Sequence, residues 1–249
     1  MIPQQKRETT SIMNPFKAPV YYYARTDSTL QTARECLAEG CPDGTFIYAG
    51  YQTEGRGRMA DRQWLSPAGE NLLGTLILRQ PASTDFTLRI GLAASLTLDS
   101  FLPSGVRTAV KWPNDIFING KKAAGILCES AGGCVLAGVG INLLQTAFLR
   151  SIEHTATSLA MIIGADKCPT FEVFIPTLLT HIQEYLSRRD WNEEISRRLW
   201  KRGSVVRFMR GQQEDDIVEG ILTGIAPDGA LCITEEDKER RYYSGELIC

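Results

Sequence analysis

The sequence lacks any apolar stretch long enough to span a membrane, and it lacks an excess of either charge. Its longest apolar runs, Ile90–Leu98 and Val135–Leu144, fall well short of the ~20 residues that a spanning helix needs. Among its 249 residues, 27 lysines and arginines meet 29 aspartates and glutamates, for a net charge of −2. We therefore expect no membrane segment, and any site for an anion must be local.

Histidine and paired cysteine motifs are also scarce. The chain has two histidines, His154 and His181, and its seven cysteines include no C-x-x-C pair. A zinc site is therefore not expected, and a Ser-His-Asp triad has few candidates. The odd number of cysteines is typical of a reduced protein, so we expect a cytoplasmic location.

The hydrophobic pattern predicts a large α+β domain over residues 20–202 and a small all-β domain over 203–249, after an N-terminal arm at 1–19. Helices are expected at 29–40, 86–102, 170–189 and 191–202. Strands of the larger domain are expected at 46–51, 71–78, 106–110, 115–118, 121–127 and 135–142. From residue 204 the hydrophobic pattern changes, and short strands are expected at 205–209, 217–225, 230–234 and 241–247.

One polar loop, residues 52–64, carries glycines and arginines at short spacing. Gly55 and Gly57 allow close approach of a ligand, and Arg56, Arg58 and Arg62 can fork onto phosphate or carboxylate oxygens. Trp64 offers a flat apolar face. The loop matches neither a dinucleotide fingerprint nor a P-loop. The residues alone leave two interpretations open, an anion-binding loop or a mobile surface loop.

A second segment, residues 111–127, predicts a β-hairpin around Asn119-Gly120. A two-residue turn would pair residue 118 with 121, 117 with 122 and 115 with 124, which brings Asp115 and Lys122 to one face. They could pair with each other on a solvated face, or Lys122 could bind a ligand carboxylate or phosphate. Trp112 in this segment is expected to be a core aromatic residue.

Together these two segments resemble the biotin protein ligase (holocarboxylase synthetase) family. The similarity rests on Gly55-Arg56-Gly57-Arg58 and Lys111-Trp112-Pro113-Asn114-Asp115, with further matches in order at Ser28-Thr29, Gln52, residues 122–126, residues 138–142 and Gly245-Glu246. It covers roughly residues 20–249. The resemblance implies a class II synthetase-like catalytic domain, with a mixed or antiparallel sheet under packed helices, and a small C-terminal SH3-like β-barrel.

The resemblance also implies a reaction. Members of the family join biotin to ATP, hold biotinyl-5'-AMP, and transfer the biotinyl group to one lysine of a biotin carboxyl carrier protein. Magnesium would enter with the nucleotide, carried mainly by its phosphates. No metal is expected to be held by protein side chains alone, although Asp115 could help to bind magnesium or could orient Lys122.

The residue roles that the resemblance implies fall into three sets. The catalytic set is Lys122, Arg58 and Asp115. The biotin set is Ser28, Thr29, Gln52, Arg56, Gly57, Arg58, Lys122 and Gly125, with the first three at the ureido ring. The ATP set is Arg56, Arg58, Arg62, Trp64, Asn114, Lys122 and Asn142, with Trp64 and Asn142 at the adenine. Leu30 stands where members commonly have Asn, which puts one biotin contact in doubt.

Two alternatives remain beside a biotin ligase. A lipoate–protein ligase would share the fold and the adenylation chemistry, but its Arg-Arg-x-Ser-Gly-Gly-Gly loop is absent. A non-catalytic biotin-binding regulator is the other alternative. About 20 residues precede the core, fewer than a helix-turn-helix domain needs, so we expect the form without direct DNA binding. A homodimer formed through the sheet is suggested only by analogy.

Overall fold

The computed structural model describes residues 7–59, 62–210 and 216–248. An eight-stranded sheet carries most of the larger domain, in the order β1-β2-β3-β4-β8-β7-β6-β5. Its strands are β1 (Glu8–Thr9), β2 (Val20–Tyr23), β3 (Phe46–Ala49), β4 (Asn71–Leu78), β5 (Thr108–Lys111), β6 (Asp115–Ile118), β7 (Lys121–Ala131) and β8 (Cys134–Asn142). The β2–β3 pair is parallel, and the other pairs are antiparallel. The predicted mixed sheet is confirmed.

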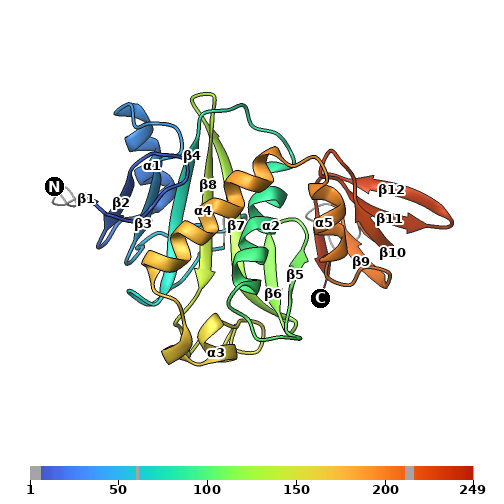
Figure 1. Ribbon diagram of the computed structural model, residues 1–249. Helices are drawn as coiled ribbons and strands as arrows, with labels where there is room; N and C mark the ends of the chain where they lie inside the picture. Colours follow the sequence, from blue (N-terminus) through green and yellow to red (C-terminus); the bar gives the residue numbers. More distant parts are fainter. Residues whose placement is uncertain (1–6, 60–61, 211–215, 249) are drawn as a thin grey trace.

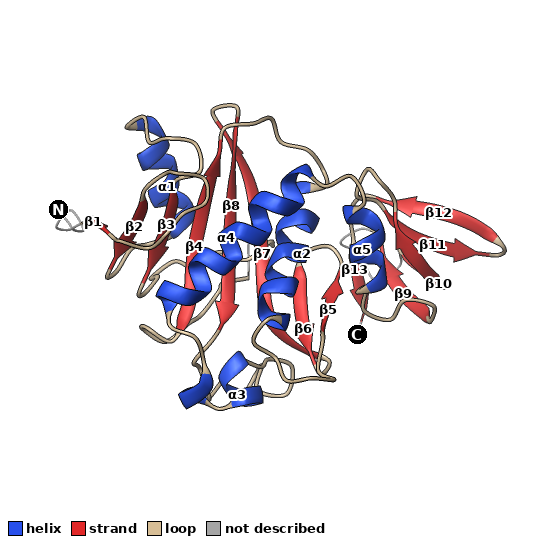
Figure 2. Ribbon diagram, in the orientation of Figure 1, coloured by secondary structure: helices blue, strands red, loops and turns tan. Residues whose placement is uncertain are grey.

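Helices cover both faces of this sheet (Figures 1 and 2). On one face, α2 (Phe86–Asp99) packs against α4 (Phe171–Ser187). On the other face, α1 (Thr29–Ala38) packs against β3, β4 and β8. The alternation of β3 explains the two layers: Phe46 belongs to the large core, and Ile47 belongs to the core under α1.

The chain between the two domains runs along the free edge of β5. After the short helices α3 (Leu159–Ile163) and η1 (Ala165–Lys167), and the long α4, helix α5 spans Trp191–Arg197. The amide of Val110 then donates to the carbonyl of Arg198 at 2.8 Å, and the amide of Trp200 donates to the carbonyl of Val110 at 2.9 Å. These bonds cover a sheet edge that would otherwise be open to pairing.

The C-terminal part is a five-stranded antiparallel sheet ordered β12-β11-β10-β9-β13. Its strands are β9 (Val205–Met209), β10 (Ile217–Ile225), β11 (Leu231–Glu235), β12 (Lys238–Tyr242) and β13 (Glu246–Ile248). Within the described ranges, β12 and β13 form opposite edges and do not pair, so a closed barrel is not seen. The single strand expected at 241–247 is also wrong, because Gly245 breaks it at φ +135° and the two halves have different partners.

Other boundaries differ from expectation in smaller ways. The helix expected at 86–102 ends at Asp99, and the helix expected at 191–202 ends at Arg197. The predicted hairpin at Asn119-Gly120 is confirmed, with Ile118 opposite Lys121, but a bulge shifts its register so that Asp115 pairs with Gly125 instead of Ala124. The described part of the arm, residues 7–19, packs on the sheet through β1.

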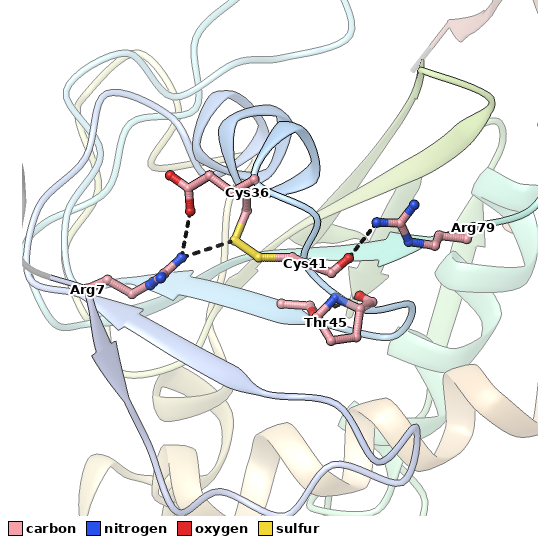
Figure 3. The surroundings of a disulfide bond; sticks show 7 residues. Arg7, Cys36, Cys41, Thr45 and Arg79 are labelled. Carbon is pink, nitrogen blue, oxygen red and sulfur yellow. Dashed lines mark hydrogen bonds and ion pairs between the residues drawn. A yellow bond between two sulfur atoms is a disulfide. The ribbon is translucent and has the colours of Figure 1, made fainter.

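A disulfide joins Cys36, near the end of α1, to Cys41 in the turn before β3 (Figure 3). The expectation that all cysteines are reduced is therefore not met here. Arg7 of the arm donates to Glu39 at 2.9 Å and contacts the Cys36 sulfur at 3.8 Å. None of the described helices is long and apolar enough to cross a membrane.

Candidate active site

The N-terminus of α1 and the segment after β3 meet through Thr29 and Gln52. Both the backbone amide and the hydroxyl of Thr29 donate to Gln52 Oε1, at 2.7 and 2.9 Å. An amide N–H can only donate, so this contact fixes which end of the Gln52 amide is the oxygen. Thr75 of β4 supports the hydroxyl from below at 3.0 Å. The Gln52 NH2 group is therefore left as the end that can donate to a ligand.

The glycine–arginine loop folds into a narrow turn beside this pair. The amide of Gly57 donates to the carbonyl of Arg62 at 2.9 Å, and the amide of Trp64 donates to the carbonyl of Gly55 at 3.0 Å. A Cβ at Gly55 would lie 2.3 Å from the Trp64 oxygen, so any side chain there would collide with backbone. The sequence needs glycine here because the two arms of the turn touch. Residues 60–61 lie outside the described residues.

The Trp64 ring packs on a part of the sheet where two glycines leave no side chains. Gly125 of β7 and Gly140 of β8 are direct cross-strand partners, and a Cβ at Gly140 would be 2.7 Å from the indole ring. Lys122 Nζ lies 5.6 Å from the centre of that ring, within cation–π range. The two glycines thus make room for the aromatic ring beside the lysine.

Lys122 and Asp115 form an ion pair across the hairpin, with Nζ 2.7 Å from Oδ1. The prediction that they share a face is confirmed despite the bulge. Backbone bonds brace the lysine: its amide donates to Thr155 at 2.7 Å, and its carbonyl accepts from Thr157 at 2.9 Å. Its side chain is about one-third exposed and lines two cavities.

Two adjoining cavities share five lining residues, namely Gly57, Arg58, Trp64, Asn114 and Lys122. The larger, of about 340 Å³, extends toward Arg62, Lys111, Asn142 and Ile152. The smaller, of about 60 Å³, extends toward Ser28, Thr29, Leu30, Gln52, Arg56 and Gly125. All residues of the three predicted sets therefore line one or both cavities. Four cations and two carboxylates line the larger one, an excess of positive charge that suits an anion.

The C-terminal sheet contributes a residue outside those sets. Glu246 of β13 lies 3.3 Å from Arg62 and 3.9 Å from Arg58, measured between charged atoms. Arg58 also donates to the Gly245 carbonyl at 3.2 Å. In the sequence, Gly245-Glu246 was identified only as one of the motifs of the family resemblance, without a role. Its place in the site depends on a contact between residues 184 positions apart, which no local pattern reveals.

Lys111 and Asn142 complete the larger cavity from its buried side. Lys111 is 7 % exposed, and its Nζ lies 5.8 Å from the ring centre of Phe117 and 5.7 Å from that of Trp200. The Asn142 NH2 group donates to the Thr157 carbonyl at 2.9 Å. Lys111 was missed as a lining residue, although it stands four positions before Asp115. Trp112 is buried against Phe208, as expected for a core residue.

Comparison with known proteins gives consistent matches over most of the chain. Residues 22–145 match the biotin/lipoate A/B protein ligase family, and residues 209–248 match the biotin protein ligase C terminal domain. The bifunctional ligase/repressor BirA of Bacillus spizizenii is 31% identical over 231 residues, which are 88% of this chain and 70% of that protein. The biotin--[acetyl-CoA-carboxylase] ligase of Mycobacterium tuberculosis is 32% identical over 240 residues, covering 90% of this chain and 86% of that one.

A solved structure has the same architecture. The biotin protein ligase from Aquifex aeolicus in complex with biotin and ATP superposes with a TM-score of 0.79 at 26% identity. The match covers 92% of this chain and 97% of that chain.

Proposed function

Because the chain belongs to the biotin protein ligase family, we propose that its two cavities bind biotin and ATP for one adenylation reaction. The enzyme joins biotin to ATP as biotinyl-5'-AMP, releases pyrophosphate, and transfers the biotinyl group to a lysine of a biotin carboxyl carrier protein. The observation that carries the site assignment is the convergence of Arg58 and Lys122, from separate segments, on both cavities.

The smaller cavity is assigned to biotin. Gln52 donates through its free NH2 group, and Ser28 and Thr29 lie beside it at the start of α1. The ureido ring of biotin carries a carbonyl oxygen and two N–H groups, which this polar end can match. Arg56, Gly57 and Gly125 complete the walls. The biotin carboxylate then points toward Lys122, where the two cavities join.

The larger cavity is assigned to ATP. A carboxylate must attack the α-phosphate, so two anions must approach each other, and fixed cations in a confined site offset their repulsion. Lys122 and Arg58 would hold the reacting groups, with Arg62 at the outer phosphates. Asn114, Asn142 and Trp64 line the space left for the nucleoside. Asp115 orients Lys122 through their ion pair.

Magnesium is assigned to the nucleotide. Asp115 and Glu246 are the two carboxylates of the larger cavity, and both already pair with cations. Two carboxylates that already pair with cations fit a magnesium ion that is held chiefly by phosphate oxygens. Asp115 is the protein residue that would contribute a ligand. We also propose a cytoplasmic location, a carrier domain as the protein partner, and a homodimer joined through the sheet.

The domain limits 20–202 and 203–249 are part of the same proposal, as is an SH3-like form for the C-terminal sheet. Of the two alternatives, lipoate ligation and regulation without catalysis, neither gains a specific contact here.

Calorimetry with biotin and with lipoate, each with and without ATP and magnesium, tests the function. We expect heat from biotin alone, a second event with pyrophosphate release when ATP is present, and no comparable response to lipoate. Equal responses to both acids would favour the lipoate alternative. Biotin binding without pyrophosphate release would favour the non-catalytic regulator.

A further inference from the structure

Leu30 forms an apolar wall of the smaller cavity, beside two hydroxyl-bearing residues. It is the second residue of α1 and is 4 % exposed. Its Cγ and Cδ1 would each lie 3.3 Å from a Cβ at Gly138, so the side chain lies directly over that glycine. Leu30 therefore occupies the space that the glycine leaves above β8.

The Leu30 wall itself carries no polar group, and the Ser28 hydroxyl beside it is assigned to the ureido ring of biotin. The Thr29 hydroxyl is committed to Gln52 and Thr75. The aliphatic side chain of this cavity that packs with Leu30 is Leu127, whereas the side chains of Ile126 and Val139 belong to the core on the other face of the sheet. A ligand atom pressed against this wall loses its water and gains no hydrogen bond in return, which is costly for any polar group.

The positions of the polar groups indicate which part of biotin meets the wall. The ureido ring is assigned to Gln52 and Ser28, and the carboxylate to Lys122. The remaining part of the bicycle is the thiophane ring, whose sulfur is an apolar thioether. The apolar side chain of Leu30 is the surface left for it.

We propose that Leu30 is a specificity-determining residue that selects the thioether form of biotin against biotin sulfoxide. The inference rests on the proposed function, and it adds the oxidation state of the ligand that the pocket accepts. The sulfoxide oxygen would be buried without a donor at this wall. We expect the wild-type chain to prefer biotin by a factor on the order of 10 to 100.

The experiment measures kcat/KM for pyrophosphate release with biotin and with biotin sulfoxide. Leu30→Asn supplies an amide donor at the wall and should reduce the preference for biotin by about tenfold. Leu30→Met keeps an apolar side chain of similar volume and should retain the preference. Leu37→Asn places the same polar group on the same helix, at a position that does not line the cavity, and should also retain it.

Melting temperatures of all variants establish that they fold, and Leu30→Thr replaces Leu30→Asn if the latter does not. A folded polar variant as selective as wild type would overturn the proposal, and so would a wild-type chain that uses both ligands equally. Failure of the proposed function looks different, since the wild-type chain would then release no pyrophosphate with biotin itself.

Discussion

Lys122 Nζ lies 2.7 Å from Asp115 Oδ1, and Lys122 lines both cavities while Asp115 lines the larger one. The backbone of the lysine is held by two bonds to the segment of Thr155 and Thr157, and its ammonium is held by Asp115. A cation fixed in this way needs little reorganisation to meet an anionic ligand, which is the arrangement expected for electrostatic stabilisation of a transition state.

Lys122→Ala is expected to reduce biotin-dependent pyrophosphate release by on the order of 100-fold or more, because the cation at the reacting carboxylate is lost. The side chain is partly exposed, so circular dichroism and the melting temperature should change little. Lys121→Ala, one residue earlier in the same strand, is the matched control. Undiminished pyrophosphate release in Lys122→Ala would refute the assigned role.

Arg58→Gly is expected to let biotinyl-adenylate escape. The guanidinium contacts Gly245 and Glu246 and so ties the loop to the C-terminal sheet. Without it, the loop loses a restraint that would keep the intermediate from water. Free adenylate released into solution, measured by chromatography, should rise about tenfold, on the scale of one lost charge-assisted hydrogen bond.

Arg58→Lys keeps the charge but not the forked donor group, and it should fall between wild type and the glycine variant. A glycine variant that retains its adenylate as wild type does would show that Arg58 does not close the loop.

Glu246→Gln is expected to loosen the same loop from the other side. Its carboxylate pairs with Arg58 and Arg62 in a partly exposed setting, where such pairs contribute about 0.2–1 kcal/mol. Trypsin should therefore cleave after the loop arginines up to about fivefold faster. Glu239→Gln, on β12 of the same sheet, is the control. Equal cleavage rates in wild type and Glu246→Gln would contradict the tether.

The disulfide is expected to protect Cys36 and Cys41, which lie in a single tryptic peptide, from alkylation. Trypsin releases residues 35–56 as one fragment that contains both Cys36 and Cys41. Alkylation of denatured protein without a reductant should leave this fragment unmodified, and alkylation after reduction should modify it twice. The fragment that contains Cys168 should be modified in both samples, because that thiol is free. Modification of residues 35–56 without reduction would show that the bond is not formed.

Stability should fall in mild acid because of His181. Burial lowers the pKa of this imidazole below its ordinary value of 6.5. The folded state therefore disfavours the charged imidazole. The contribution of neutral His181 to the free energy of unfolding is complete above pH 6.5, and it is lost as the pH falls toward the lowered pKa.

The free energy of unfolding should therefore decline below pH 6.5 in wild type and less so in His181→Gln. The amide of that variant can still reach Thr97, which lies 2.9 Å from His181 Nδ1 in wild type. His154→Gln, at an exposed site, should follow wild type. A His181→Gln profile identical to wild type would exclude the histidine as the source.

Sequence patterns located most of the fold because its elements carry strong local signals. The hairpin at Asn119-Gly120 is set by its turn, and α2 by an almost continuous apolar run. The helix was expected to continue to Leu102 because the run is apolar on most faces and Pro103 was expected to stop it, yet Phe101 and Leu102 pack on the core from a turn. Apolar periodicity reports burial, and a turn at the end of a helix can bury the same residues.

The site residues were found through motifs, and their partners were not. Arg58 and Lys122 stood out by residue type and spacing, but Glu246 meets them only after the C-terminal sheet has docked. The bulge between Ile116 and Phe117 was equally invisible, because a two-residue turn fixes only the first pairs of a hairpin. Contacts of this kind depend on tertiary packing, which single-sequence patterns do not contain.

Strand β13 is the last of the described elements to be synthesised, and it carries the carboxylate that meets the loop of residues 55–64. On the ribosome, the glycine–arginine loop therefore emerges long before its counterion. The larger cavity cannot be completed until translation has passed Glu246. A chain that ends early in the C-terminal sheet would therefore lack the carboxylate that holds the loop at this cavity.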